Sequence, residues 1–240
     1  LGDVYKRQNR VCIMNLNDLT KKYDKMQKKY GAKELNAIYN GGLDINPDIC
    51  FVFMNPTKRN IASYKSWKGI KAPWIGTKNI WDLFFKLDLL DEDIYIKIKS
   101  IKGSEWDEQF ALDVYDNVKK HKYFITNLGK CTQVDARELP DSIYIEYLNL
   151  LKQEFKIIKP KIIILFGNQV SSIVLDDKIS VSQARKKCFI RKIDGEEYKF
   201  YPVYYPVGNG RFNIDKAIED IKWIIENELK SDNKELLKIN

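Results

Sequence analysis

Residues 49–59 read Ile49-Cys50-Phe51-Val52-Phe53-Met54-Asn55-Pro56-Thr57-Lys58-Arg59, and the fold can be predicted outward from them. Six apolar residues in succession predict a strand that is buried on both faces of a parallel sheet. Pro56 cannot donate to a neighbouring strand and restricts Asn55 to extended backbone, so the strand should end there. The Asn55 carboxamide would then lie at the carboxyl end of a central strand, where open α/β sheets bind ligands. The simpler interpretation is a strand-to-loop junction in which asparagine forms a turn.

Three further segments have the apolar composition of strands. They are residues 123–128, 161–166 and 198–204. The first ends on another asparagine, Asn127, and the last leads into Tyr205. Residues 188–193 and the last segment flank Asp194-Gly195, which is a hairpin turn signal.

Apolar residues at helical spacing separate these strands. The predicted helical regions are residues 16–40 (one or two helices, with Gly31 as a break and Gly41-Gly42 as the end), 77–90 (capped by Thr77), 92–120, 141–158 (capped by Asp141), 168–175 and 214–229. Strands that alternate with helices predict a three-layer α/β/α fold around a mainly parallel four-stranded sheet. A single domain would span residues 16–229, with a disordered or non-native leader at 1–15 and a frayed tail at 230–240.

The composition is that of a folded, basic protein. Hydrophobic residues make up 44% and aromatic residues 12% of the 240 residues, unlike an intrinsically disordered chain. No apolar run approaches the roughly 20 residues that cross a bilayer, so no membrane partner is expected. The net charge of +8 favours a polyanionic partner such as nucleic acid. We expect a monomeric, cytoplasmic protein.

The four cysteines, Cys12, Cys50, Cys131 and Cys188, are widely scattered. No pair has the C-x-x-C spacing of a zinc or iron–sulfur site, which predicts reduced thiols, no metal site and no cofactor.

Four short motifs stand at residues 53–57 (FMNPT), 73–76 (PWIG), 125–131 (ITNLGKC) and 204–211 (YYPVGNGR). In this order they resemble the uracil-DNA glycosylase superfamily over roughly residues 45–229. Residues 53–57 (FMNPT) are similar to its first motif, written G-Q-D-P-Y or G-M-N-P-G in different branches. Residues 73–76 (PWIG) resemble the P-F-V-G segment that places an aromatic ring over the flipped base. Residues 125–131 (ITNLGKC) resemble I-T-N-V-V-K-C of the iron–sulfur branch. Residues 204–211 (YYPVGNGR) align with H-P-S and the DNA-inserting loop after it.

The resemblance implies roles in hydrolysing an N-glycosidic bond. Asn55 would orient the attacking water, because a carboxamide cannot act as a general base. Tyr205 would donate from its neutral phenol to the charge that develops on the base. Met54, Trp74 and Asn127 would bind the flipped base, Trp74 by stacking and Asn127 by reading the base edge. Taken alone, Trp74 also fits a core indole, Asn127 a turn and Tyr205 a strand aromatic.

Basic and glycine-rich residues beside the motifs would contact DNA. Glycines let a loop approach the DNA backbone closely, and Arg211 would bind phosphate. The predicted DNA-binding residues are Lys58, Arg59, Lys130, Arg137, Gly208, Asn209, Gly210 and Arg211. A plain turn and lysines that cluster by chance are the simpler interpretations.

The chain departs from the family pattern in three respects. Tyr205 replaces the motif histidine and Val207 the serine, and the only histidine, His121, precedes the second strand. The iron–sulfur branch needs four cysteines, whereas only Cys131 stands at a ligand position and the neighbouring position falls near Tyr147. No cluster is therefore expected.

Two functions from different classes fit these observations. The first is a DNA glycosylase that removes uracil or a related deaminated base. The alternative is a catalytically divergent nucleic-acid or nucleotide-binding protein, which the loss of the histidine makes credible. A third, weaker hypothesis is an enzyme that acts on free nucleosides.

Overall fold

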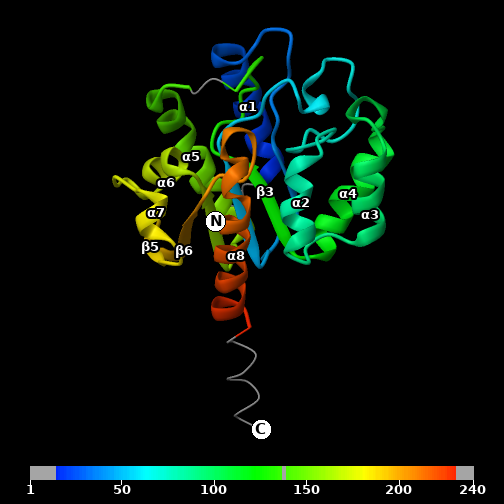
Figure 1. Cartoon of the computed structure of the whole chain (residues 1–240). Coiled ribbons are helices and arrows are strands. Elements are labelled where there is room, and N and C mark those ends of the chain that lie inside the picture. Colours follow the sequence, from blue (N-terminus) through cyan, green and yellow to red (C-terminus); the bar gives the residue numbers. More distant parts are fainter. Residues whose placement is uncertain (1–14, 137–138, 231–240) are drawn as a thin grey trace, which may run out of the picture.

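The computed structural model describes residues 15–136 and 139–230, which form one mixed sheet between two layers of helices (Figure 1). The strands of this described part are β1 (Asn40–Gly42), β2 (Ile49–Phe53), β3 (Tyr123–Asn127), β4 (Ile162–Phe166), β5 (Phe189–Ile193) and β6 (Glu196–Val203), in the order β1-β3-β2-β4-β6-β5. Strands β3, β2, β4 and β6 are parallel, whereas β1 and β5 pair antiparallel at the edges.

The predicted three-layer fold and its parallel four-stranded centre are confirmed. The sheet is wider than four strands, because β5, the first arm of the predicted hairpin, and β1 extend its two edges. The sequence of β1, Asn-Gly-Gly, has no apolar pattern, so this strand could not be predicted from periodicity.

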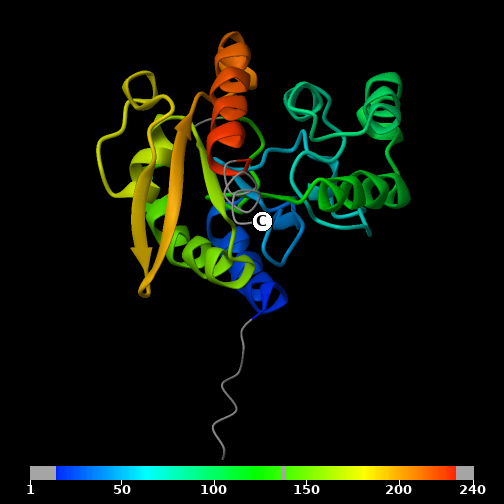
Figure 2. The same ribbon diagram turned by 90° about the horizontal axis from the view of Figure 1, so that it is seen from below.

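Helices cover both faces of the sheet (Figure 2). They are α1 (Leu16–Tyr30), α2 (Asn79–Lys86), α3 (Glu92–Ser100), α4 (Glu108–Lys120), α5 (Asp141–Ile158), α6 (Asn168–Leu175), α7 (Val181–Ala184) and α8 (Ile214–Glu228). Helices α2, α3, α4 and α8 share a core with Phe51 and Phe53 of β2. Helices α5, α6 and α7 share the other core with Cys50 and Val52, and α1 packs beside α5. Successive β2 residues therefore face opposite layers, as an alternating strand requires.

Three predicted helix boundaries differ from the structure. Helix α1 ends at Tyr30 with Gly31 as its C-cap, at the predicted break, but no second helix follows it before the glycines of β1. Thr77 does not cap α2, because its hydroxyl donates to the Trp74 carbonyl and α2 begins at Asn79. Asp141 lies in the first turn of α5 and makes no cap hydrogen bond. Thr77 and Asp141 are residue types that often cap helices, and each lies within two residues of the N-cap without occupying it.

The predicted terminal segments fall mainly outside the described residues. Asn15, which we assigned to the leader, is the N-cap of α1 and forms a capping box with Asp18. No helix among the described residues is long and apolar enough to span a membrane.

The four central parallel strands end at one edge of the sheet. The loops that follow them carry Asn55 after β2, Asn127 at the end of β3, Gly167 after β4 and Tyr205 after β6. The fold thus gathers four loops that are distant in sequence, as expected of the carboxyl edge of an α/β sheet.

Candidate functional site at the carboxyl edge of the sheet

A cleft of about 1380 Å³ opens at the carboxyl edge of the sheet. All but two of the residues that sequence analysis placed in the site line it. They are Met54, Asn55, Lys58, Arg59, Trp74, Asn127, Tyr205, Gly208, Asn209, Gly210 and Arg211. Of the other two, Lys130 is buried elsewhere and Arg137 lies outside the described residues.

The loops after β2 and β3 stay hydrogen-bonded to each other beyond the ends of the strands. The backbone bonds run from Leu128 N to Phe53 O (2.7 Å), Gly129 N to Met54 O (2.8 Å), Gln133 N to Pro56 O (3.0 Å) and Lys58 N to Gln133 O (2.9 Å). These hydrogen bonds join the two loops in one ladder. The ladder fixes the backbone of Asn55 relative to that of Asn127.

Asn127 lines the cleft, and its side chain has an unpaired donor. Its side chain is 2% exposed, and its Nδ2 is buried without a hydrogen-bond partner among the described residues. Unpaired buried amide groups are uncommon in folded proteins, because each one costs about 1–3 kcal/mol. A ligand with an acceptor atom at this place would remove that cost.

Asn55 is held by partners on two sides. Its Oδ1 accepts from the hydroxyl of Tyr144 at 2.6 Å, and its Nδ2 donates to the carbonyl of Pro56 at 3.2 Å. Asn55 is half-buried, while Tyr144, in the first turn of α5, is fully buried. Two hydrogen bonds therefore hold the Asn55 carboxamide in place at the cleft.

Aromatic rings form the apolar part of the cleft. Phe53 stacks on Phe166 with ring centroids 4.4 Å apart. The ring planes of Trp74 and Tyr205 lie at 76° and 88° to that of Phe53, at centroid distances of 4.9 and 6.1 Å. Such edge-to-face contacts favour fixed ring orientations.

Trp74 has a strained backbone at the cleft. Its φ is 66°, in the left-handed region that bulky residues seldom adopt, and its Nε1 is buried without a partner among the described residues. The loop around it is fixed: Asn60 Nδ2 donates to Ala72 O at 2.8 Å, and Ile61 N donates to Ile75 O at 3.0 Å. Strain of this kind is more frequent at functional sites than elsewhere.

Tyr205 lies under the loop that follows it. A Cβ at Gly210 would lie 2.1 Å from the Tyr205 carbonyl oxygen, so only glycine permits this approach. Burial raises the pKa of Tyr205 above its usual value of 10.0. The phenol thus stays protonated and neutral at physiological pH, and it can donate a hydrogen bond.

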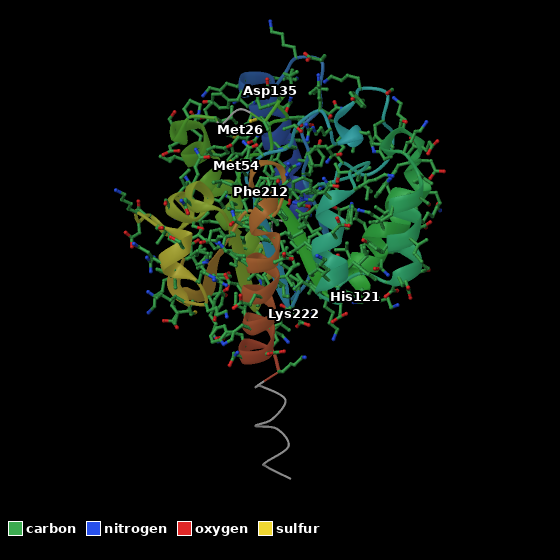
Figure 3. The ribbon with its side chains drawn as sticks, in the orientation of Figure 1. Met26, Met54, His121, Asp135, Phe212 and Lys222 are labelled. Atoms are coloured by element: carbon green, nitrogen blue, oxygen red, sulfur yellow. The ribbon has the colours of Figure 1, made fainter. Side chains whose placement is uncertain are left out.

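The rim of the cleft is basic and includes an aromatic residue that sequence analysis missed. Lys58, Arg59 and Arg211 are exposed. Phe212 is 80% exposed, with the Arg211 guanidinium 4.9 Å from its ring centroid. Figure 3 shows Phe212 and Met54 in the same part of the molecule, while His121 lies at the other end. A phenylalanine directly after GNGR was the available signal, but an aromatic ahead of a helix is more often core.

The prediction that Lys130 belongs to the basic, DNA-binding rim is wrong, because Lys130 is buried. Its side chain is 1% exposed, and its ammonium group donates to Glu154 Oε2 (3.0 Å), to the Asn127 carbonyl (2.6 Å) and to the Thr126 hydroxyl. Burial lowers the pKa of Lys130, and the Glu154 charge opposes that shift. A lysine whose three N–H groups are all used inside the protein cannot bind phosphate.

The carboxylate of Glu154 is fully buried and fully paired. Besides Lys130, it accepts from the Tyr23 hydroxyl, the Asn40 amide and the Thr126 hydroxyl, each at 2.7 Å. This network, which we call the Lys130–Glu154 network, joins α1, β1, β3 and α5 directly beneath the backbone of Asn127.

The residues around Cys131 do not fit an iron–sulfur cluster. Cys131 is buried in an apolar cluster with Leu19, Tyr23, Tyr147 and Leu150, and burial raises the pKa of its thiol. In the described part of the chain, no three His, Cys, Asp or Glu side chains come together around one possible metal position. His121 instead pairs with Asp91, at 2.7 Å between Nε2 and Oδ1.

The turn after β4 also lines the cleft, and sequence analysis assigned it no role. Gly167, at φ 87°, leads into α6 through Asn168 and Gln169. A Gln169 Oε1 without a partner among the described residues adds an acceptor there. The available signal was a glycine directly after a buried strand.

Comparison with known proteins agrees with this geometry. The family model described as the uracil DNA glycosylase superfamily matches residues 41–222, well over half of the chain. The matched range contains β2, β3, β4 and β6 and every loop that lines the cleft. No curated protein matches the chain.

Proposed function

The chain belongs to the uracil-DNA glycosylase superfamily, and on that premise we propose that it is a DNA glycosylase hydrolysing the N-glycosidic bond of uracil or a related deaminated base. The observation that carries the proposal is the pair of carboxamides, Asn55 and Asn127, on two hydrogen-bonded loops of one cleft. One amide is available for a water and the other for a base edge.

The donor and acceptor of Asn127 match uracil. The amide oxygen would accept from N3–H, and the buried Nδ2 would donate to O4, which gives that donor its missing partner. Cytosine has an acceptor at N3 and a donor at N4, so the same amide in the same orientation rejects it. Hydrogen-bond mismatches of this kind discriminate strongly, because buried polar groups stay unpaired.

The aromatic rings explain how an extruded base would be held. Taking a base out of the duplex costs a few kcal/mol, which stacking and edge hydrogen bonds must return. We assign the stacking to Trp74. Stacking of a base on an aromatic side chain contributes about 1–3 kcal/mol, which offsets much of the cost of extrusion.

The reaction that these groups support is displacement by water. The water oxygen attacks C1′ of the deoxyribose, the C1′–N bond breaks, and its electron pair leaves with the base. Asn55 holds the water, while Asn127 and the neutral Tyr205 phenol stabilise the anion of the base. The departing base finally takes up the proton that the water loses.

The rim supports binding to DNA. Lys58, Arg59 and Arg211 would contact phosphates, which carry most of the affinity of such proteins. Phe212 is an exposed apolar ring at the mouth of the cleft, suited to occupy the space that an extruded base leaves in the stack.

The test is an excision assay on matched oligonucleotides. Single- and double-stranded DNA carrying uracil, hypoxanthine or a G·T mismatch is incubated with the protein, and abasic sites are detected by alkaline cleavage. We expect abasic sites in the uracil-containing strands and none in undamaged DNA. Tight DNA binding without any abasic sites would favour the catalytically divergent binding protein, and release of bases from free nucleosides alone would favour the third hypothesis.

A further inference from the structure

The side-chain amide of Asn55, which would hold the water, has a hydrogen-bond partner in helix α5. The Tyr144 hydroxyl donates to Asn55 Oδ1 at 2.6 Å, across 89 positions of the sequence. Tyr144 is 0% exposed and belongs to the first turn of α5, so its ring is fixed by the core on that face. The Asn55 loop follows β2. The bond thus ties the cleft to a helix that does not itself line it.

Gly129 makes room for this contact. A Cβ at Gly129 would lie 3.0 Å from Cε1 of Tyr144 and 3.4 Å from Cβ of Asn55. The tyrosine ring therefore passes against the backbone of Gly129 on its way to the amide. A side chain at this position would press on the Tyr144 ring and come into van der Waals contact with Asn55.

The Pro56 carbonyl selects the orientation of the Asn55 amide, and the Tyr144 hydroxyl holds Oδ1 in place. The Pro56 carbonyl can only accept, so it faces Nδ2. Oδ1 must then face Tyr144, whose hydroxyl donates to it. The second lone pair of Oδ1 stays available for a water.

We propose that Tyr144 is a positioning residue that orients the Asn55 amide for the attacking water, an inference that rests on the proposed glycosylase function. A water that donates a hydrogen to a protein acceptor becomes a better nucleophile, because its oxygen gains electron density for the attack on C1′. Oδ1 of Asn55 accepts such a hydrogen. A rotated amide would offer N–H instead, which would donate to the water oxygen and weaken it as a nucleophile.

The first experiment compares two tyrosines of the same helix. Tyr144→Phe removes the hydroxyl and keeps the ring, and Tyr147→Phe, one turn later in the cluster around Cys131, is the matched control. We expect kcat for uracil excision to fall about 10- to 100-fold in Tyr144→Phe, as positioning errors cause, with KM nearly unchanged. Tyr147→Phe should keep the kcat of the wild type. Equal kcat in Tyr144→Phe and wild type would overturn the proposal.

A double-mutant cycle separates positioning from a general structural role. With Asn55→Ala as the background, Tyr144→Phe should not lower the residual single-turnover rate any further, because the amide that its hydroxyl positions has gone. A fall as large as in the wild-type background would show that Tyr144 acts independently of Asn55, which contradicts the proposal.

Gly129→Ala approaches the same contact without removing a polar group. The added methyl group should displace the Tyr144 ring from Asn55 and lower kcat in the same direction. If Tyr144→Phe proves too unstable to purify, this variant carries the kinetic test, and an unchanged kcat in it would count against the proposal.

Nuclear magnetic resonance distinguishes failure of this inference from failure of the proposed function. The side-chain amide signals of Asn55, assigned through their loss in Asn55→Ala, should shift in Tyr144→Phe and stay in place in Tyr147→Phe. A wild-type protein that excises no base, yet shows this shift, would refute the glycosylase and leave Tyr144 as the residue that orients Asn55. Signals that stay in place in Tyr144→Phe would refute the orienting role, whatever the activity.

Discussion

At the scale of single residues, Asn127 gives the sharpest prediction. Asn127→Asp replaces the proposed donor to O4 with a second acceptor, so an unpaired charge would face the uracil carbonyl. The mismatch should cost about 1–3 kcal/mol or more and lower uracil excision by roughly 5- to 150-fold. A carboxylate can still accept from the cytosine amino group, so the ratio of cytosine to uracil excision should rise. Single-turnover excision from paired uracil and cytosine oligonucleotides measures both.

As a control, thermal unfolding of Asn127→Asp and of the wild type is compared, to show that the variant is folded. An unchanged uracil rate in a folded Asn127→Asp variant would remove Asn127 from base reading.

Residues at strand ends were predictable from the sequence, whereas their supporting partners were not. Asn55, Asn127 and Tyr205 directly follow apolar runs, and the carboxyl ends of parallel strands must meet. Tyr144 belongs to an apolar helical stripe, which predicts only a core side chain, and its partner is 89 positions away. Lys130 was assigned wrongly because lysine is exposed by default and nothing local indicates pairing with Glu154.

At the scale of elements, the Lys130–Glu154 network joins four of them, and its charges depend on each other. Lys130→Met or Glu154→Gln alone leaves one uncompensated buried charge, which should lower the free energy of unfolding by about 3–5 kcal/mol. The double variant carries neither charge, so it should lose less than the sum of the two single losses. Urea unfolding of all four proteins gives the coupling energy. Additive losses would show that the two charges do not stabilise each other.

Phe212 lies in the short 3-10 helix η3 (Gly208–Asn213) and gives a second prediction at this scale. Phe212→Ala should lower excision from duplex DNA roughly tenfold, because the gap left by the base would stay unfilled. Single-stranded DNA has no stack to fill and should be cleaved at nearly the wild-type rate. Ile190→Ala, an exposed apolar residue of the edge strand β5, is the control. An equal loss on both substrates would make Phe212 a general binding residue.

The differences between predicted and observed elements have a common physical reason. Periodicity detects apolar faces that are several residues long, so it found the central strands and the amphipathic helices. Strand β1 has three residues without an apolar pattern and owes its place to pairing with β3. Tertiary pairing of this kind is absent from local sequence.

At the scale of the whole molecule, the net charge of +8 predicts affinity for DNA that depends on salt. The logarithm of the affinity should fall linearly with the logarithm of the salt concentration. Arg211→Gln, at the cleft, should reduce the steepness of that line by about one unit. Lys222→Gln, at the far end of the molecule in Figure 3, should leave it unchanged. Fluorescence anisotropy with a labelled duplex measures the slopes, and equal slopes for both variants would place the DNA elsewhere.

The Lys130–Glu154 network also limits how this protein can evolve. A lineage that loses either residue first must pass through an intermediate with a lone charge in the interior, which selection removes. The two positions should therefore change together or not at all, and close relatives should hold both residues or neither. A relative with one charge and a neutral partner should carry a compensating substitution at the position of Tyr23, Asn40 or Thr126, the other partners of that carboxylate.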